Sequence, residues 1–206
     1  MIPVIYEDDW FLIVDKPAGL LVIPTPKNER HTLTNLLNEK LKKARNDGET
    51  YQLHPCHRLD RDTSGLIVYA KGKSAQQKMM DEFKNRRIEK TYIAFVRGRL
   101  KGHQGEIRSA VEGQAALTRY RVIKFCPGFS VVEAQPVTGR KNQLRVHFKK
   151  IGNPILGETR FAFRRDFEIK AKRLCLHART LEFTHPLTGK TIKVESELPE
   201  KMEAMI

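Results

Sequence analysis

The sequence lacks the features that mark membrane, secreted and disulfide-rich proteins. No apolar run approaches the ~18 residues that a membrane-spanning helix needs, and the longest are short stretches such as "FLIV" and "GLIVYA". The opening "MIPVIYEDDW" carries acids where a signal peptide carries Lys or Arg. The three cysteines, Cys56, Cys126 and Cys175, are an odd number and widely spaced. We therefore expect a cytoplasmic protein without membrane association.

Motifs for common cofactors are also absent. There is no G-x-x-x-x-G-K-[ST] and no G-x-G-x-x-G after a predicted strand, so nucleotide hydrolysis and dinucleotide binding are not indicated. "HPCH" brings His54, Cys56 and His57 together, but no companion cluster supplies the remaining ligands of a zinc site. We expect chemistry without a cofactor or a metal ion.

Positive charge, in contrast, is abundant. The 206 residues contain 38 Lys and Arg against 24 Asp and Glu, a formal net charge of +14. The excess is uneven, because residues 139–179 hold twelve bases and three acids, and residues 84–101 hold seven bases and one acid. Such clusters indicate a polyanionic partner, above all nucleic acid.

Hydrophobic periodicity and turn residues predict the elements. Strands are expected over 4–6, 11–14, 65–71, 90–98, 116–125 and 129–138, helices over 32–45, 75–85 and 143–151, and two strands joined by a Pro-Leu-Thr-Gly turn within 173–199. There is no βαβ alternation, internal repeat or linker. We therefore expect one domain over residues 1–206, of the α+β class, with a mixed, mainly antiparallel sheet and flanking helices.

Three details of this prediction are specific enough to check. Residues 46–55 should form a loop, and Gly105 should mark a turn, because glycine and polar residues gather there. The second helix should be capped by Ser74, with Ala75, Met79, Met80 and Phe83 facing inward.

The stretch "HRLDRDTSGLIVYAK", residues 57–71, crowds ionisable side chains into a loop and then turns into an apolar strand. It resembles the signature of RluA-type pseudouridine synthases. Other segments also resemble the family's, and together they occur in the family's order and cover nearly the whole chain: "YEDDWFLIVDKPAGLLV", "EKTYIAFVRG", "VTGRKNQLRVHF", "GNPILGETRF" and "RLCLHARTLEFTHP". The resemblance implies the pseudouridine synthase fold with a central RNA-binding cleft. It also implies an isomerase that converts uridine in RNA to pseudouridine without a cofactor.

The resemblance assigns the catalytic carboxylate to Asp60 and its arginine partner to Arg145, in "NQLRVH". A carboxylate beside C1′ of the ribose can attack that carbon, stabilise an oxocarbenium-like transition state or remove a nearby proton. The residues do not choose among these roles. Without the resemblance, Asp60 would be interpreted as a turn residue or as a partner of Arg58 or Arg61.

The resemblance also gives roles in RNA binding to Arg58 and Tyr92. Arg58 is implied to enter the RNA stack in place of the extruded uridine, since a planar cation can both stack and bind phosphate. Tyr92, in the family's Lys-x-Tyr strand, can stack on the flipped uracil or accept the proton that leaves C5. Their alternative interpretations are a simple phosphate contact or salt bridge for Arg58 and an ordinary core tyrosine for Tyr92.

Two departures from the family's usual pattern stand out. Lys141 and Asn142 replace a small residue and a histidine before Gln-Leu-Arg, which puts any contact of that histidine in doubt. The S4 RNA-binding domain that some members carry is not found, so the catalytic domain is expected to recognise RNA by itself. We expect the target to be a stem-loop of ribosomal or transfer RNA and the protein to act as a monomer, with no obligatory protein partner.

Two rival functions remain open from the residues alone. A non-catalytic RNA-binding or RNA-remodelling protein on the same fold would need none of the site residues, although Asp60, Tyr92 and Arg145 are all present. A carboxylate-dependent hydrolase would need a second carboxylate, and Asp62 is the near candidate. Release of free uracil would mark the hydrolase.

Overall fold

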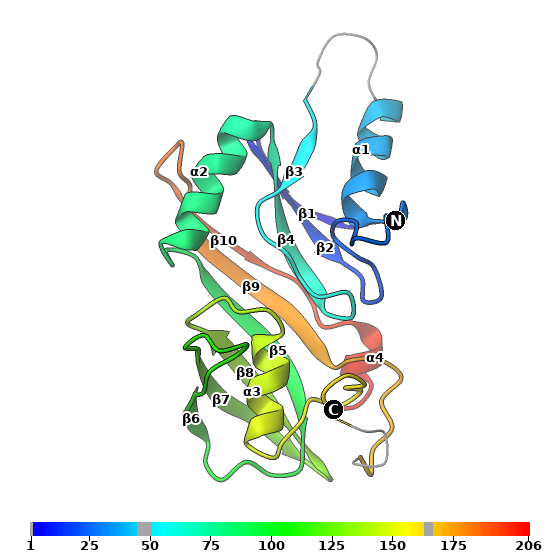
Figure 1. Ribbon diagram of the computed structural model, residues 1–206, viewed down its shortest axis with the longest axis vertical. Helices are drawn as coiled ribbons and strands as arrows, with labels where there is room; N and C mark the ends of the chain where they lie inside the picture. Colours follow the sequence, from blue (N-terminus) through cyan, green and yellow to red (C-terminus); the bar gives the residue numbers. More distant parts are fainter. Residues whose placement is uncertain (1, 45–50, 163–166) are drawn as a thin grey trace. The chain divides into compact units, whose positions relative to one another are not determined.

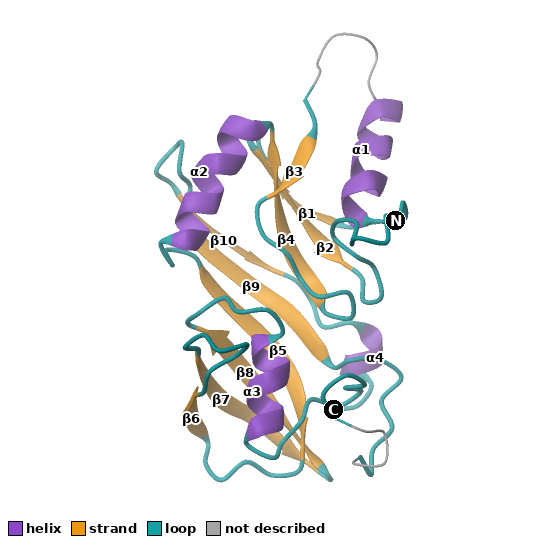
Figure 2. Cartoon of the chain, in the orientation of Figure 1, coloured by secondary structure: helices purple, strands orange, loops and turns teal. Residues whose placement is uncertain are grey.

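The computed structural model describes residues 2–44, 51–162 and 167–206. The chain divides into two compact units, one formed by Met1–Ile88 with Leu181–Ser196, and the other by Glu89–Thr180 with Glu197–Ile206. Strands outnumber helices in both (Figures 1 and 2). Strand β9 (Leu176–Thr184) belongs to both units, because the boundary falls within it.

The first unit is built around two strands that are buried on both faces. Strand β2 (Phe11–Lys16) lies antiparallel between β1 (Val4–Glu7) and β4 (Ser64–Lys71). Short strand β3 (Leu53–Pro55) pairs with the end of β4, and β10 (Thr191–Glu195) pairs with β9.

Helices cover these strands and explain their continuous apolar sequence. Side chains of β2 and β4 alternate between two hydrophobic clusters, one containing Met79 of α2 (Lys73–Lys84) and the other Leu33 of α1 (Leu33–Ala44). A strand with both faces buried favours apolar residues at consecutive positions, as in residues 11–14 and 66–70. Thr32 caps α1, because its Oγ1 accepts a hydrogen bond from the amide of Asn35 at 3.3 Å.

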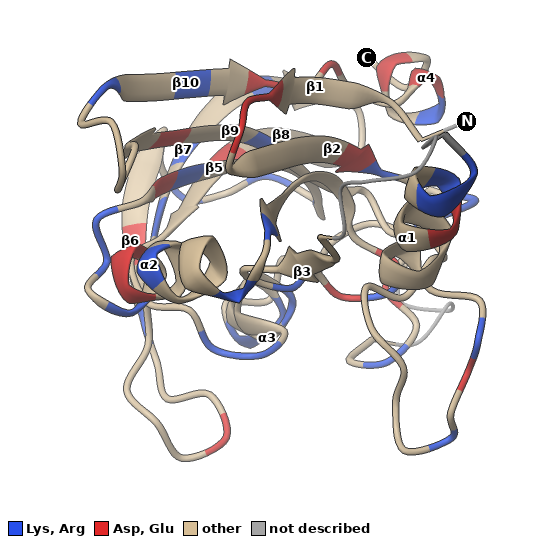
Figure 3. Ribbon diagram, turned by 90° about the horizontal axis from the view of Figure 1, so that it is seen from above, with Lys and Arg blue, Asp and Glu red and all other residues tan. Residues whose placement is uncertain are grey.

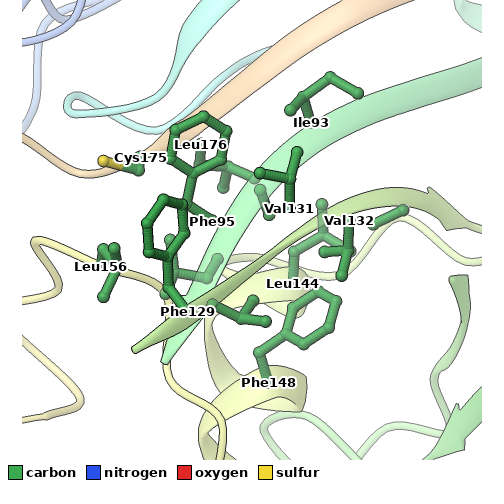
Figure 4. Close-up of a cluster of buried hydrophobic side chains, with 14 of the residues drawn as sticks. Ile93, Phe95, Phe129, Val131, Val132, Leu144, Phe148, Leu156, Cys175 and Leu176 are labelled. Carbon is green, nitrogen blue, oxygen red and sulfur yellow. The ribbon is translucent and has the colours of Figure 1, made fainter. Parts of the chain in front are cut away.

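The second unit is an antiparallel sheet covered by a helix. Its strand order is β5-β8-β7-β6, with bounds Glu89–Arg97 for β5, Gln104–Arg108 for β6, Leu117–Cys126 for β7 and Phe129–Pro136 for β8. Helix α3 (Gln143–Lys150) packs Leu144 and Phe148 into the core of this unit (Figure 4). A short helix α4 (Glu200–Glu203) adds Met202 to the same core.

The expected α+β class with a mainly antiparallel sheet is confirmed, as are the predicted helices and most of the strands. The structure differs from the prediction at three places for local reasons. Residues 53–55 form β3 instead of a loop, since Leu53 is buried against the first unit and His54 pairs with Ala70. Residues 46–50 of that expected loop, and the bases 164 and 165 within the basic segment 139–179, lie outside the described residues.

The other two differences concern a glycine and a helix. Gly105 lies inside β6, opposite Tyr120, where the tyrosine ring fills the space that a side chain would need. Helix α2 begins at Lys73 after Gly72, without a side-chain cap from Ser74. Ala75 and Met79 are buried as expected, but Met80 is 43% exposed because it falls on the outer face of the helix.

Candidate active site

The charged half of residues 57–71 forms a tight loop at the entrance to β4, as the sequence predicts. The amide of Thr63 donates to the carbonyl of Asp60 at 3.2 Å, which closes the turn. Leu59 is buried and anchors the loop, while Asp60 is half-buried and Arg58 is exposed. The loop therefore presents Arg58 and Asp60 with an apolar anchor between them.

A buried lysine fastens this loop to β2. The side chain of Lys16 is fully buried, and its Nζ donates to the carbonyls of Pro17 at 2.9 Å, Leu20 at 2.8 Å and Arg61 at 3.0 Å. Three carbonyls match the three N–H donors of an ammonium group. The amide of Gly19 also donates to the Arg61 carbonyl at 2.8 Å. The residue next to Asp60 is thus held from two sides.

His57 lets the chain leave the sheet without losing a hydrogen bond. In a hydrogen-bonded pair of an antiparallel ladder, the two opposed residues exchange two backbone hydrogen bonds. Here the amide of Cys56 donates to the Val68 carbonyl at 2.9 Å, but the Val68 amide donates to Nε2 of His57 at 3.0 Å. The ring replaces a strand carbonyl, so the backbone is free to turn toward Asp60. Nε2 is therefore unprotonated, and the neutral ring carries its proton on Nδ1.

The His57 ring also packs on a helix. Its centroid lies 4.4 Å from that of Phe83 in α2, at an interplanar angle of 34°. The start of the loop is therefore fixed by a hydrogen bond at one side and by an aromatic contact at the other.

In the second unit, β5 carries Tyr92 opposite Ala134 of β8. Tyr92 is half-buried against the hydrophobic core of this unit, while Ala94 and Val96 on the same face are fully buried. Two residues earlier, burial lowers the pKa of Lys90, whose ammonium group lies beside Gly139.

Arg145 is buried in the first turn of α3 and is held by a carboxylate. Its Nε donates to Oε2 of Glu158 at 2.7 Å and its Nη2 to Oε1 at 2.8 Å. Glu158 also accepts the amides of Arg160 at 2.7 Å and Phe161 at 3.2 Å. Burial alone would raise the pKa of Glu158, but the hydrogen bonds and charge of Arg145 and the two amides lower it below its usual value.

Asn142 adds a third contact to the same guanidinium. Its Oδ1 accepts a hydrogen bond from Nη1 of Arg145 at 3.1 Å. Asn142 has φ 54° and ψ 21°, in the left-handed region that asparagine tolerates better than most residues. The departure from the family's histidine thus keeps a polar contact at this position, since an amide oxygen holds the arginine.

Gln143 fixes the loop that precedes α3. Its Oε1 accepts from the Thr138 hydroxyl at 2.7 Å and from the Arg140 amide at 3.0 Å, and its Nε2 donates to the Leu117 carbonyl at 2.9 Å. The amide side chain therefore ties this loop to the start of β7, and Arg145 projects from a rigid base.

The structure places Asp60 and Arg58 in one loop of the first unit, and Tyr92 and Arg145 in the second unit. Sequence reasoning gave no role to Lys16, His57 or Glu158. Two signals were available. Lys16 is a charged residue at the end of an apolar strand that is buried on both faces. Glu158 is one of only three acids in residues 139–179, a segment that also contains twelve bases.

Within the described ranges, no three His, Cys, Asp or Glu side chains come together as metal ligands would. Among the helices of those ranges, none has the length and apolar character to cross a membrane. Cys56, Cys126 and Cys175 are free thiols.

Comparisons with known proteins show the family to which the chain belongs. The family model described as RNA pseudouridylate synthase matches residues 10–150. The dual-specificity RNA pseudouridine synthase RluA of Haemophilus influenzae is 34% identical over 92% of this chain and 90% of its own length. The ribosomal large subunit pseudouridine synthase C of Vibrio vulnificus is 33% identical over 98% of this chain and 68% of its own length.

A solved structure gives the same result. The human RNA pseudouridylate synthase domain containing 4 superposes with a TM-score of 0.81 at 25% identity, covering 97% of this chain and 90% of that protein. The family match includes β2, the Asp60 loop, Tyr92 and Arg145, so it spans every predicted site residue. The chain therefore belongs to the RNA pseudouridine synthases, an isomerase family, and within them to the RluA type.

Proposed function

We propose that this RNA pseudouridine synthase modifies specific uridines in stem-loops of ribosomal RNA, transfer RNA or both, with Asp60 as the catalytic carboxylate. The observation that carries the proposal is the rigid presentation of Asp60, in a loop fixed by Lys16, next to the exposed Arg58. Relatives named for large-subunit and dual-specificity activity support the choice of RNA.

The reaction is an isomerisation in which no atom is gained. The C1′–N1 bond of uridine breaks, the uracil rotates, and a C1′–C5 bond forms. The proton on C5 then leaves, and N1 gains one. Asp60 acts at C1′ as nucleophile or electrostatic stabiliser, or removes a proton as a base.

The remaining site residues act around this carboxylate. Arg58 takes the place of the extruded uridine, whose removal from the stack costs a few kcal/mol. Tyr92 stacks on the flipped uracil or accepts the C5 proton, and Arg145 keeps Asp60 ionised. We propose that residues 1–206 act as one catalytic domain whose central cleft takes the RNA, as a monomer in the cytoplasm.

The deciding experiment is tritium release from total ribosomal and transfer RNA labelled with [5-³H]uridine. Wild type is expected to release tritium, and Asp60→Ala and Asp60→Asn are expected to lose at least about 10³-fold in rate. Asp62→Asn is the matched control and should retain activity.

Other outcomes identify the rival functions. Tight RNA binding without tritium release by wild type would leave a non-catalytic RNA-binding protein. Release of free uracil, dependent on Asp62, would identify a hydrolase. Sedimentation of the protein alone would test whether it is a monomer, and cell fractionation would test whether it is located in the cytoplasm.

A further inference from the structure

Three segments that lie at one end of the second unit contain no acidic residue. The β5–β6 connection, the β7–β8 turn and the end of α3 meet there (Figure 1). The amide of Gly98 donates to the Gly128 carbonyl at 2.8 Å, and the Arg97 Nη2 donates to the Gly152 carbonyl at 3.1 Å. Residues 97–103, 124–128 and 149–154 contain six Lys and Arg and no Asp or Glu.

The ring of Phe125 contacts two of the side chains at this end. The Arg99 Cζ lies 4.3 Å from the centroid of the Phe125 ring, and the His103 ring meets the same ring edge-on at 5.2 Å. Arg99, Lys101 and His103 are all exposed. We call Arg99, Lys101, His103 and Phe125 the basic end surface.

The arginine and lysine of the basic end surface form no ion pairs with carboxylates of the described residues. Elsewhere on this unit, Arg119 binds Glu106 and Arg121 binds Glu133. Among the residues that the structure describes, Arg99 and Lys101 have no such carboxylate partner. The neighbouring Lys124 is engaged by the carbonyl of Ile206, and Glu168 lies beside Gly128, so the surface is bounded on that side.

The chemistry of the surface fits a nucleic-acid backbone. A guanidinium that rests on an aromatic ring is pre-oriented and keeps its N–H groups for the oxygens of a phosphate. The nearby Lys101 adds positive charge, and the exposed ring of His103 adds stacking area. Basic residues also lie along α3 (Figure 3), and its last turn adds Lys149 and Lys150 at this end of the unit.

The surface is remote from Tyr92 on the same strand. Tyr92 and Arg97 are five positions apart, about 16 Å along β5, and Arg99 lies beyond the end of the strand. A substrate that reached both points would have to extend well past the modified uridine.

We propose that the basic end surface binds the phosphate backbone of RNA that flanks the modified uridine, so that this end of the molecule contributes affinity and not chemistry. The inference rests on the proposed function for the identity of the RNA. Phosphate contacts contribute salt-dependent affinity with little sequence preference.

The test is the salt dependence of binding to an unmodified transcript of 23S ribosomal RNA. Arg99→Ala/Lys101→Ala should lower the slope of log K against log salt by about 2 and weaken binding roughly tenfold. Phe125→Leu should produce about half of that effect, because it keeps an apolar side chain but removes the ring under Arg99. The rate of tritium release at saturating RNA should stay at the wild-type level in both variants.

The matched control is Lys73→Ala/Lys78→Ala, which removes the same charge from exposed positions of α2. An unchanged slope in Arg99→Ala/Lys101→Ala, or an equal loss in the control, would overturn the proposal. So would loss of binding to phosphatidylglycerol vesicles with RNA binding intact, which would point to a lipid surface. The slope is measured without turnover, so an inactive wild type would refute the proposed function and leave this test readable.

Discussion

The buried guanidinium of Arg145 donates hydrogen bonds to both carboxylate oxygens of Glu158, at 2.7 and 2.8 Å. Neither side chain is more than 6% exposed, and the two residues are thirteen positions apart in sequence. A bidentate pair fixes both the position and the plane of the guanidinium. The residue that the family resemblance pairs with Asp60 is therefore held in place by the fold before any RNA arrives.

Glu158→Gln should destabilise the protein in a pH-dependent way. The pKa of Glu158 is lower in the folded chain than its usual value. Its contribution to stability is therefore complete above the unfolded pKa of about 4.3 and is lost as the pH falls through the folded pKa. Urea unfolding should show a loss of about 3 kcal/mol at pH 7 that shrinks below pH 4.

The control for that experiment is Glu133→Gln, which removes the more exposed pair with Arg121. It should cost less than about 1 kcal/mol. Equal losses in both variants, or a loss in Glu158→Gln that does not change with pH, would contradict the role given to the carboxylate.

Asn142→Gly and Asn142→Ala should distinguish the effect of the hydrogen bond to Arg145 from the effect of the left-handed backbone conformation. Both remove the hydrogen bond to Arg145, so both should lower the tritium-release rate several-fold. Only alanine is strained at φ 54°, so Asn142→Ala should be less stable than Asn142→Gly by about 1–2 kcal/mol. Thermal unfolding of the pair checks this order, and full activity in Asn142→Gly would show that the amide does not position Arg145.

Lys16→Met should impair the reaction more than RNA binding. The change leaves the carbonyls of Pro17 and Leu20 without the donor that Lys16 supplies, at about 1–3 kcal/mol for such a buried group, and leaves the Arg61 carbonyl with only the Gly19 amide. Because a small displacement of a reacting group is costly, kcat should fall about 100-fold. Lys71→Met, which removes a partly exposed pair with Glu7, is the control and should keep its kcat. A variant with reduced RNA affinity but normal kcat would argue against positioning of Asp60.

His57→Gln and His57→Phe test the imidazole that replaces a strand carbonyl. Glutamine places an acceptor near the position of Nε2, while phenylalanine keeps the contact with Phe83 but leaves the Val68 amide unsatisfied. We expect His57→Gln to keep a kcat within about threefold of wild type and His57→Phe to lose about 10- to 100-fold. If phenylalanine restored activity better than glutamine, packing and not the hydrogen bond would be the function of the ring.

Several site features could be predicted from sequence because their signals are local. The run "GLIVYA" is apolar at every position since both faces of β4 are covered, and Thr32 precedes a helical repeat of leucines. Where a local signal had two readings, the prediction was wrong. Gly105 resembled a turn residue but lies where Tyr120 leaves no room for a side chain. Met80 fell on the exposed face because a helix has few positions that point into the core.

The sequence by itself determined the family, the α+β class, and Asp60, Arg58, Tyr92 and Arg145 as the residues to test, since motifs, periodicity and charge are properties of short segments. Only the tertiary structure decided how Asp60 and Arg145 are held. Lys16 reaches the Arg61 carbonyl across 45 positions, and Glu158 reaches Arg145 across thirteen. Such contacts depend on the path of irregular loops, where no periodic pattern exists, and on the need of a buried ion for partners wherever the chain supplies them.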